Sequence, residues 1–197
     1  MEIVGTERSK KGKVSLMMRV GVGQSQRPNL AEAIEDATTI AMGKAKLAKA
    51  DLALLFATVD YKAEYGQLFE TVQEISGCDH LVGCSGMNIL RSAGGFEGEP
   101  AVAVLVLRSD DVSAIPFLVS TDDASTIGTA IRERILTELG ENSLLVLFPD
   151  VRCVSPEALV GQIGEDASEL ALVGAAASGE GRAQRPNPTD RNATRSP

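Results

Sequence analysis

The sequence predicts an α/β protein made of two related halves and a tail without regular structure. Short, almost continuously apolar runs alternate with segments of helical spacing, a pattern typical of strands covered by helices on both faces. The order helix, strand, helix, strand occurs twice along the 197 residues. The chain is 44% hydrophobic and long enough for one well-buried core. We therefore expect one α/β core with two β-α-β-containing pseudo-repeats and a β-hairpin after the first.

The first half begins with a helix that starts after the cap residue Asn29 and carries Glu32 three positions later. The run "DLALLFA" (residues 51–57) predicts a strand, and helical spacing resumes from Tyr65. A second short strand, "HLVGC", follows at residues 80–84. Residues 88–108 predict a hairpin, because the turn signal "AGGFEGEP" precedes the apolar run "AVAVLVL". Strand-helix-strand connections of this kind are expected to be right-handed.

The second half repeats this order. A helix over residues 124–139 places four apolar residues on one face, and the strand "SLLVLFP" follows. A helix capped by Ser155 and the strand "LALVG" complete the half. The tripeptide "LVG" at Leu81 recurs at Leu172, 91 residues later. The four apolar residues of the helix over residues 124–139 are Ile127, Ile131, Ile135 and Leu139.

Charge and composition exclude several classes of function. The net charge is −8, and residues 182–197 hold four Arg and one Asp, so the rest of the chain is still more acidic. This argues against nucleic acid and anionic membranes as partners. The sequence shows no signal peptide and no apolar run near the length of a membrane span, and its three cysteines are an odd number. We expect a cytoplasmic protein with reduced thiols.

Three parts follow from these patterns. Residues 1–14 are expected to form an N-terminal arm, residues 15–181 the folded domain, and residues 182–197 a disordered tail. The tail offers almost nothing to bury.

The segment "HLVGCSGMNIL" places Ser85 and Cys84 between glycines, which suggests a nucleophile. A nucleophile elbow requires G-x-S-x-G, but Met87 stands where the second glycine belongs. The only histidine, His80, would lie about 16 Å from Ser85 along an extended strand. A hydrolase that uses Ser85 or Cys84 therefore stays an alternative, and no enzymatic activity is expected.

A metal site at Cys78, His80 and Cys84 is disfavoured because the three residues span too much of an extended strand. No metal and no cofactor are expected. The remaining interpretation is that the backbone of "GCSG" binds a ligand, because its N–H groups can hold a small molecule at the carboxyl end of a strand. Tight packing of the strand end explains the same small residues equally well.

The second half supplies an equivalent small-residue turn, "GAAASGEG". A third candidate is "RVGVGQSQRPN", where Gly21 and Gly23 resemble the start of a phosphate loop, although no third glycine and no G-K-[ST] follow. An ordinary strand-to-helix turn is the alternative there. The expected ligand-binding residues are Gly83, Cys84, Ser85, Gly86, Gly174, Ala175, Ala176, Ser178, Gly23 and Ser25.

Five segments, in this order and spacing, resemble the FIST N domain, the N-terminal part of F-box and intracellular signal transduction proteins. They are "VGVGQSQRPNLAEAIEDATTIA", "ADLALLFAT", "HLVGCSGMNIL", "GEPAVAVLVL" and "ALVGAAASGEG", and the resemblance covers residues 15–181. It implies a sensory domain that binds small ligands, among them amino acids, without established catalysis. "GCSG" corresponds to the family's glycine-cysteine-serine turn, and "GAAASGEG" to its glycine-rich turn.

Two departures from the family pattern are visible. Ala175 stands where a second glycine is expected after Gly174. After Gly181, the family's aromatic strand and its FIST C partner domain do not follow. We therefore expect a truncated or frame-shifted reading frame with an unpaired sheet edge. An interaction module that binds a protein through "GGFEGEP" is a further alternative.

Overall fold

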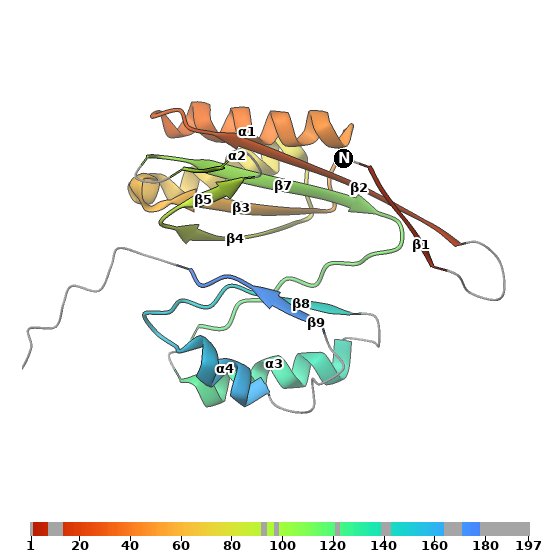
Figure 1. The fold of residues 1–197 in the computed structure, drawn as a ribbon, viewed down its shortest axis with the longest axis vertical. Coiled ribbons are helices and arrows are strands. Elements are labelled where there is room, and N and C mark those ends of the chain that lie inside the picture. The colour runs from red at the N-terminus through yellow and green to blue at the C-terminus, as the bar shows by residue number, and fades with distance from the viewer. Residues whose placement is uncertain are drawn as a thin grey trace, which may run out of the picture.

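The computed structural model describes residues 2–7, 14–91, 94–96, 99–120, 123–138, 143–163 and 171–177. Figure 1 shows these residues in four layers: helices, a five-stranded sheet, a two-stranded sheet and a second pair of helices. This confirms the α/β class. The predicted tail, residues 182–197, lies outside the described residues.

The first unit contains the five-stranded sheet, two helices and a small hairpin. Its sheet has the order β1-β2-β7-β3-β4, in which β3 and β4 are parallel and the other neighbours antiparallel. The elements are β1 (Glu2–Glu7), β2 (Val14–Ser25), α1 (Leu30–Ala45), β3 (Leu52–Thr58), the 3₁₀ helix η1 (Val59–Glu64), α2 (Tyr65–Ser76), β4 (His80–Gly86), β5 (Ile89–Arg91), β6 (Gly94–Phe96) and β7 (Val102–Ser109).

Strand β2 can lie directly under α1 because two of its residues that face the helix are glycines, which have no side chain. A Cβ at Gly21 would lie 2.0 Å from the carbonyl oxygen of Ala41, and one at Gly23 would lie 1.8 Å from that of Ala37. The prediction that these glycines belong to a turn before the helix is therefore wrong. They lie within a strand, where they allow close helix packing. The residues predicted as an N-terminal arm contain β1, which pairs with β2.

Strand β7 corrects the predicted hairpin over residues 88–108. The hairpin consists only of β5 and β6, whereas β7 is inserted between β2 and β3. Val102, Val104 and Val106 are fully buried and belong to the same core as α1. An apolar strand of this kind gains more from a central place in the sheet than from an exposed hairpin arm.

The second unit contains α3 (Ala124–Glu138), β8 (Leu144–Leu147), α4 (Pro156–Ile163) and β9 (Ala171–Gly174). Strands β8 and β9 are parallel, and a bridge between Asp150 and Ala177 extends the pairing. The predicted helix face is buried at Ile127 and Ile131. The other two residues of that face, Ile135 and Leu139, lie outside the described side chains. The order of elements matches the first unit, while the sequence duplication itself stays a prediction.

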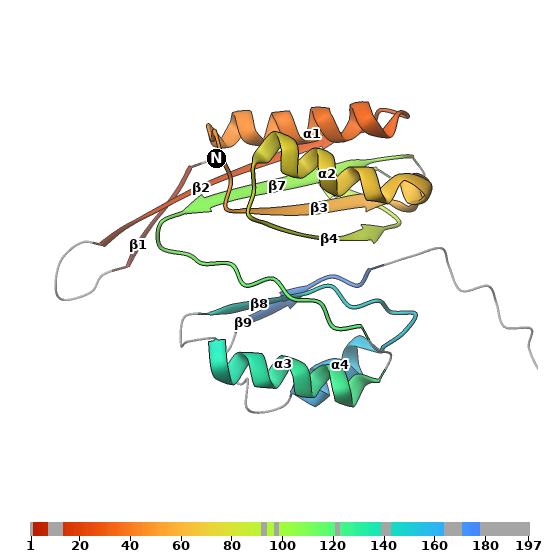
Figure 2. The ribbon, with the colours of Figure 1, turned by 180° about the vertical axis from the view of Figure 1, so that it is seen from behind.

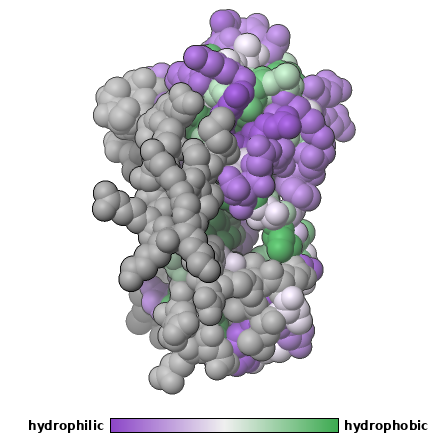
Figure 3. All heavy atoms as spheres, turned by 90° about the vertical axis from the view of Figure 1, so that its right-hand side faces the viewer, coloured by the Kyte–Doolittle hydropathy of each residue, from purple (hydrophilic) through white to green (hydrophobic). Residues whose placement is uncertain are grey.

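The five-stranded sheet and the β8–β9 sheet each carry helices on one face, not on both as the apolar runs predicted. Figure 2 shows α1 and α2 together on one side of the larger sheet and the second unit on the other. Leu55 faces the helices and is buried, whereas Phe56 faces the second unit and contacts Phe148 there. Figure 3 shows hydrophobic side chains at the level where the two units meet. The opposite sheet thus replaces the second helix layer.

Within the described residues, no helix combines the length and the apolar character that crossing a membrane requires.

Candidate functional site

Three strands of the larger sheet end at the same edge. Strand β7 runs antiparallel to both β2 and β3, and β4 is parallel to β3, so β2, β3 and β4 share one direction. Carboxyl ends of strands are the usual place for ligands in α/β proteins. The predicted residues Ser25, Ser85 and Gly86 all lie at this edge.

The "GCSG" segment is the end of strand β4 and not a turn. Its residues pair in regular register with β3, from Leu55 opposite Gly83 to Thr58 opposite Gly86. A Cβ at Gly83 would lie 2.1 Å from the carbonyl oxygen of Leu55, so this glycine is required for packing. The prediction of a turn is corrected, because the apolar strand continues through the small residues.

Neighbouring side chains of β4 face opposite sides of the sheet. Leu81 packs against the core under α1 and α2, and Ser85 shares that face by alternation. Cys84 lies opposite Phe56 on the face toward the second unit. The serine and the cysteine therefore belong to different environments.

Ser85 is part of a hydroxyl network at the start of α2. The Tyr65 hydroxyl donates to the carbonyl oxygen of Thr58 at 3.1 Å. Burial raises the pKa of Tyr65, and a hydrogen bond from Ser85 acts in the opposite direction. The fully buried Thr58 in turn accepts from the N–H of Ala101 at 3.0 Å through Oγ1. Hydroxyl groups thus connect the ends of β3 and β4 to the start of β7.

Strand β4 also presents backbone donors at an open edge. The N–H of His80 donates to the carbonyl oxygen of Asp51 at 3.2 Å, so this residue and every second one after it face β3. The N–H groups of Gly83 and Ser85 consequently point away from β3. No described strand pairs with that side of β4. The side of β4 away from β3 therefore carries these two N–H groups.

The second unit repeats this geometry at β9. A Cβ at Gly174 would lie 2.1 Å from the carbonyl oxygen of Leu147, as at Gly83. Ala175 donates to that oxygen at 3.2 Å, and Ala177 donates to Pro149 at 2.8 Å. The N–H groups of Gly174 and Ala176 therefore point away from β8.

Residues 174–176 are exposed, and Ser178 lies outside the described residues. In Figures 1 and 2, the carboxyl ends of β4 and β9 lie on the same side of the molecule.

His80 is not placed to act as a catalytic base for Cys84 or Ser85. Burial raises the pKa of the Cys84 thiol, which favours its neutral form. His80 shares a face with Cys84 but lies about 13 Å along the strand, and it is on the opposite face from Ser85. Among the described residues, no group of three metal-ligating side chains is close enough to hold an ion.

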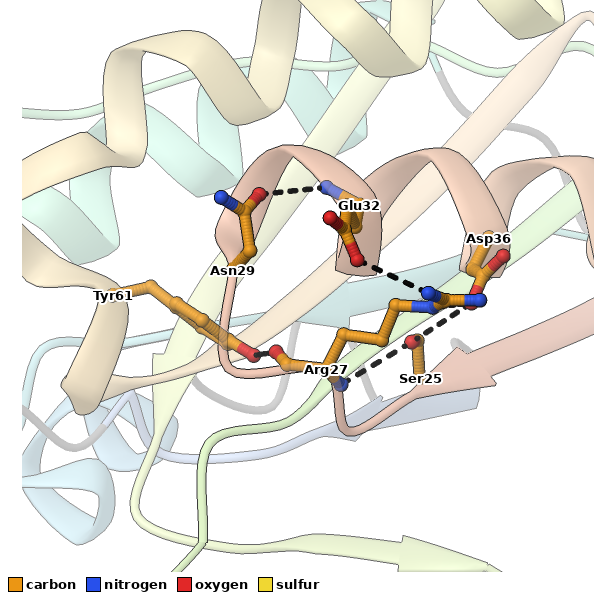
Figure 4. Close-up of polar contacts among 6 residues, drawn as sticks. All are labelled: Ser25, Arg27, Asn29, Glu32, Asp36 and Tyr61. Atoms are coloured by element: carbon orange, nitrogen blue, oxygen red, sulfur yellow. Dashed lines mark hydrogen bonds and ion pairs between the residues drawn. The ribbon is translucent and has the colours of Figure 1, made fainter.

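A polar cluster surrounds Ser25 and the start of α1 (Figure 4). The Arg27 guanidinium bonds Asp36 and also Glu32, the latter at 3.0 Å, and the hydrogen bond with Asp36 contributes most to its raised pKa. Ser25 Oγ donates to Asp36 at 3.5 Å. The buried Tyr61 donates to the carbonyl oxygen of Arg27.

Two carboxylates neutralise the Arg27 side chain. The ion pairs and the hydrogen bond from Tyr61 hold the chain between β2 and α1 in place. The cluster places Ser25, which is buried, within this framework.

Sequence reasoning missed Arg27, Thr58, Tyr61 and Tyr65. One signal was present: a polar and aromatic stretch follows directly on the apolar run of β3. The predicted Gly23 lies two residues before Ser25 on β2 and faces α1.

Two comparisons with known proteins bear on the family of this chain. A search of curated proteins finds no match. A family model described as FIST N domain matches residues 51–193, well over half of the chain. The matched part begins at β3 and includes both β4 and β9 with their small-residue ends. The chain therefore belongs to the FIST N domain family.

Proposed function

We propose that this FIST N domain is a sensory module that binds a small ligand of the amino-acid class at the carboxyl ends of β4 and β9. Family membership supports a role in signal transduction. The observation that carries ligand binding is the pair of outward N–H groups at Gly83 and Ser85 on the open edge of β4. Gly174 and Ala176 present a second such pair.

The chemistry of these groups favours a ligand with carboxylate or carbonyl oxygens. N–H donors two residues apart on a strand are about 6.6 Å apart, so the carboxylate of a single amino acid would accept from one of them while the rest of the ligand lies along the strand edge. The net charge of −8 disfavours polyanions, while a zwitterionic amino acid carries no net charge. The proposed contacts are therefore backbone hydrogen bonds, with the hydroxyl of Ser85 close by.

A thermal-shift screen against the amino acids tests this proposal. A ligand at a hundred times its dissociation constant stabilises by about 2.7 kcal/mol, which raises the melting temperature by roughly 5 to 10 °C for a chain of this size. The amide resonances of Gly83, Ser85, Gly174 and Ala176 should shift when the same ligand is added to ¹⁵N-labelled protein. No thermal shift with any amino acid, or shifts confined to other amides, would contradict the proposal.

Substitution of Ser85 tests the contribution of its hydroxyl group separately from that of the backbone N–H groups. Ser85→Ala keeps the N–H group but removes the hydroxyl and its hydrogen bond to Tyr65, so affinity should fall several-fold. Ser125→Ala is the matched control, because Ser125 is exposed at the start of α3 in the second unit. Equal affinities for the two variants would show that the Ser85 hydroxyl does not contribute to ligand binding.

The proposed function includes no catalysis and locates the protein in the cytoplasm. The raised pKa of Cys84 supports a neutral, unreactive thiol. The three cysteines are all unpaired, which suits a reducing compartment. Ester or thioester turnover that disappears in Cys84→Ala or Ser85→Ala would favour the hydrolase alternative. The proposed partner within the signalling protein is a FIST C domain.

A further inference from the structure

We infer that Ser85 makes the proposed ligand site selective for amino acids with an unmodified α-amino group, because Tyr65 directs the Ser85 oxygen to act as a hydrogen-bond acceptor. This inference rests on the proposed function and names the ligand group that Ser85 contacts. It follows from the directions of the hydrogen bonds that connect the ends of β3 and β4.

The direction of these hydrogen bonds is set at Thr58. Its carbonyl oxygen lies 3.1 Å from the Tyr65 hydroxyl oxygen and can only accept, so the single proton of that hydroxyl is donated to it. The phenol oxygen then offers lone pairs, but no further proton, to any other neighbour. A group that bonds to the Tyr65 oxygen from another side must therefore donate.

Ser85 is a group that donates to Tyr65. It pairs with Ala57 in the β3–β4 register, directly before Thr58, and it shares the helix-facing side of the sheet with Leu81. Burial raises the pKa of Tyr65, and the hydrogen bond from Ser85 opposes this shift, as a donor that stabilises the phenolate does. A serine hydroxyl has one proton and two lone pairs, so a serine that donates to Tyr65 meets a ligand as an acceptor.

Ser85 thus presents two groups of opposite polarity. Its backbone N–H points away from β3 and donates, whereas its side-chain Oγ accepts. An α-amino acid carries a carboxylate and an ammonium group on one carbon atom. The carboxylate accepts from the N–H group, and the ammonium group donates to Oγ. A carboxylic acid without an amino group makes only the first of these contacts.

The charge near Tyr65 favours a cationic donor. Asp60 and Glu64 are exposed on η1, which leads directly into α2. Burial is the largest cause of the raised pKa of Tyr65, and the negative charge of Asp60 also raises it, so this carboxylate acts on the Tyr65 hydroxyl. The same charge attracts an ammonium group that approaches Ser85.

The test compares each standard amino acid with the carboxylic acid that has hydrogen in place of the amino group, for example L-alanine with propionate and L-leucine with 4-methylpentanoate. Isothermal titration calorimetry of the full chain gives the two dissociation constants of each pair. We expect the amino acid that binds to do so about tenfold or more tightly than its counterpart, because the counterpart lacks the charged donor.

Tyr65→Phe tests the role of hydrogen-bond direction. Without the phenol oxygen, the Ser85 hydroxyl can turn and donate to the carboxylate that both members of a pair carry. The preference for the amino acid should therefore fall below about threefold, although both compounds still bind. In Ser85→Ala, which lacks the acceptor, the preference should fall likewise.

Thr137→Val is the control for the loss of a hydroxyl. The Thr137 hydroxyl also donates to a backbone carbonyl oxygen, that of Glu133 at 2.8 Å, but it lies on α3 in the second unit. This variant should keep the full preference. Because the preference is a ratio measured within one variant, a loss of stability in Tyr65→Phe does not produce the same result.

Three results would overturn the inference. Equal affinity of both members of a pair would contradict selectivity for the amino group while leaving amino-acid binding intact. A tenfold preference that persists in Tyr65→Phe would show that Tyr65 does not direct the Ser85 hydroxyl. Binding of no amino acid at all would overturn the proposed function together with this inference.

Discussion

Phe56 of β3 and Phe148, which follows β8, meet edge to face with ring centroids 5.4 Å apart and planes at 75°. Each ring follows a leucine whose carbonyl oxygen lies against a glycine of the neighbouring parallel strand, Leu55 against Gly83 and Leu147 against Gly174. The two phenylalanines therefore occupy corresponding positions in the two units. Their contact joins the two sheets where the small-residue strand ends lie.

The first prediction concerns this aromatic pair. Edge-to-face pairs contribute about 0.5 to 1.5 kcal/mol beyond their buried area. A double-mutant cycle with Phe56→Leu and Phe148→Leu, measured by urea unfolding, should give a coupling energy in that range. A second cycle with Phe56→Leu and Phe69→Leu is the control, because Phe69 is exposed on α2 and should show no coupling. Equal coupling in the two cycles would refute the direct contact between the units.

The second prediction concerns the glycines of β4 and β9. A methyl group at Gly83 or Gly174 would collide with a backbone oxygen 2.1 Å away, and backbone cannot move aside cheaply. Gly83→Ala and Gly174→Ala should each lower the free energy of unfolding by about 1 to 3 kcal/mol. Gly43→Ala is the matched control: this glycine of α1 has open space around it, so alanine should stabilise by about 0.5 to 1 kcal/mol. A stable Gly83→Ala variant would mean that β4 is not packed this closely against β3.

The third prediction concerns the hydroxyl of Thr58 at the end of β3. Thr58→Val keeps the shape of the side chain but leaves the buried N–H of Ala101 without its acceptor. An unsatisfied buried donor costs about 1 to 3 kcal/mol, so urea unfolding should show a loss of that size. Thr58→Ser retains the oxygen and should lose less than Thr58→Val. If the two variants are equally stable, the hydrogen bond does not contribute to stability.

The sequence was sufficient where local patterns determine structure. The cap at Asn29 is observed, with the N–H of Glu32 donating to its side chain at 3.1 Å. The runs around Leu55 and Leu145 form strands as predicted, and both leucines are buried. Helical spacing and apolar runs are local signals, and they survive in the folded chain because the same residues form the core.

The failures arise where distant residues decide the structure. Gly21 and Gly23 suggest a loop in sequence, and only the backbone of α1 above them explains a strand. The apolar run of β7 pairs with β2, 77 to 91 residues earlier, so its central place had no local signal. The same holds for the site, since the network from Tyr65 to Ser85 joins residues from different elements. Sequence reasoning could therefore locate the strand end but not its partners.

The fourth prediction concerns the acid sensitivity of α3. Hydrogen bonds from the Thr126 hydroxyl and backbone N–H lower the pKa of Asp123 below its ordinary value, because they favour the charged carboxylate. The folded-state pKa is thus below the unfolded one. The stabilisation is complete above the ordinary aspartate range near pH 4 and is lost as the pH falls through the folded-state pKa. Asp123→Asn still accepts from the N–H of Thr126 but does not titrate.

Melting temperatures from pH 7 to pH 2.5 should therefore fall less steeply for Asp123→Asn than for the wild type at the acid end. Thr126→Val removes the largest cause of the lowered pKa, so its acid dependence should lie between the two. Identical acid dependence in all three proteins would show that the Asp123 cap does not couple protonation to folding. Because the cap starts the helix that carries Ile127 and Ile131 into the second core, the loss should appear as cooperative melting of that unit.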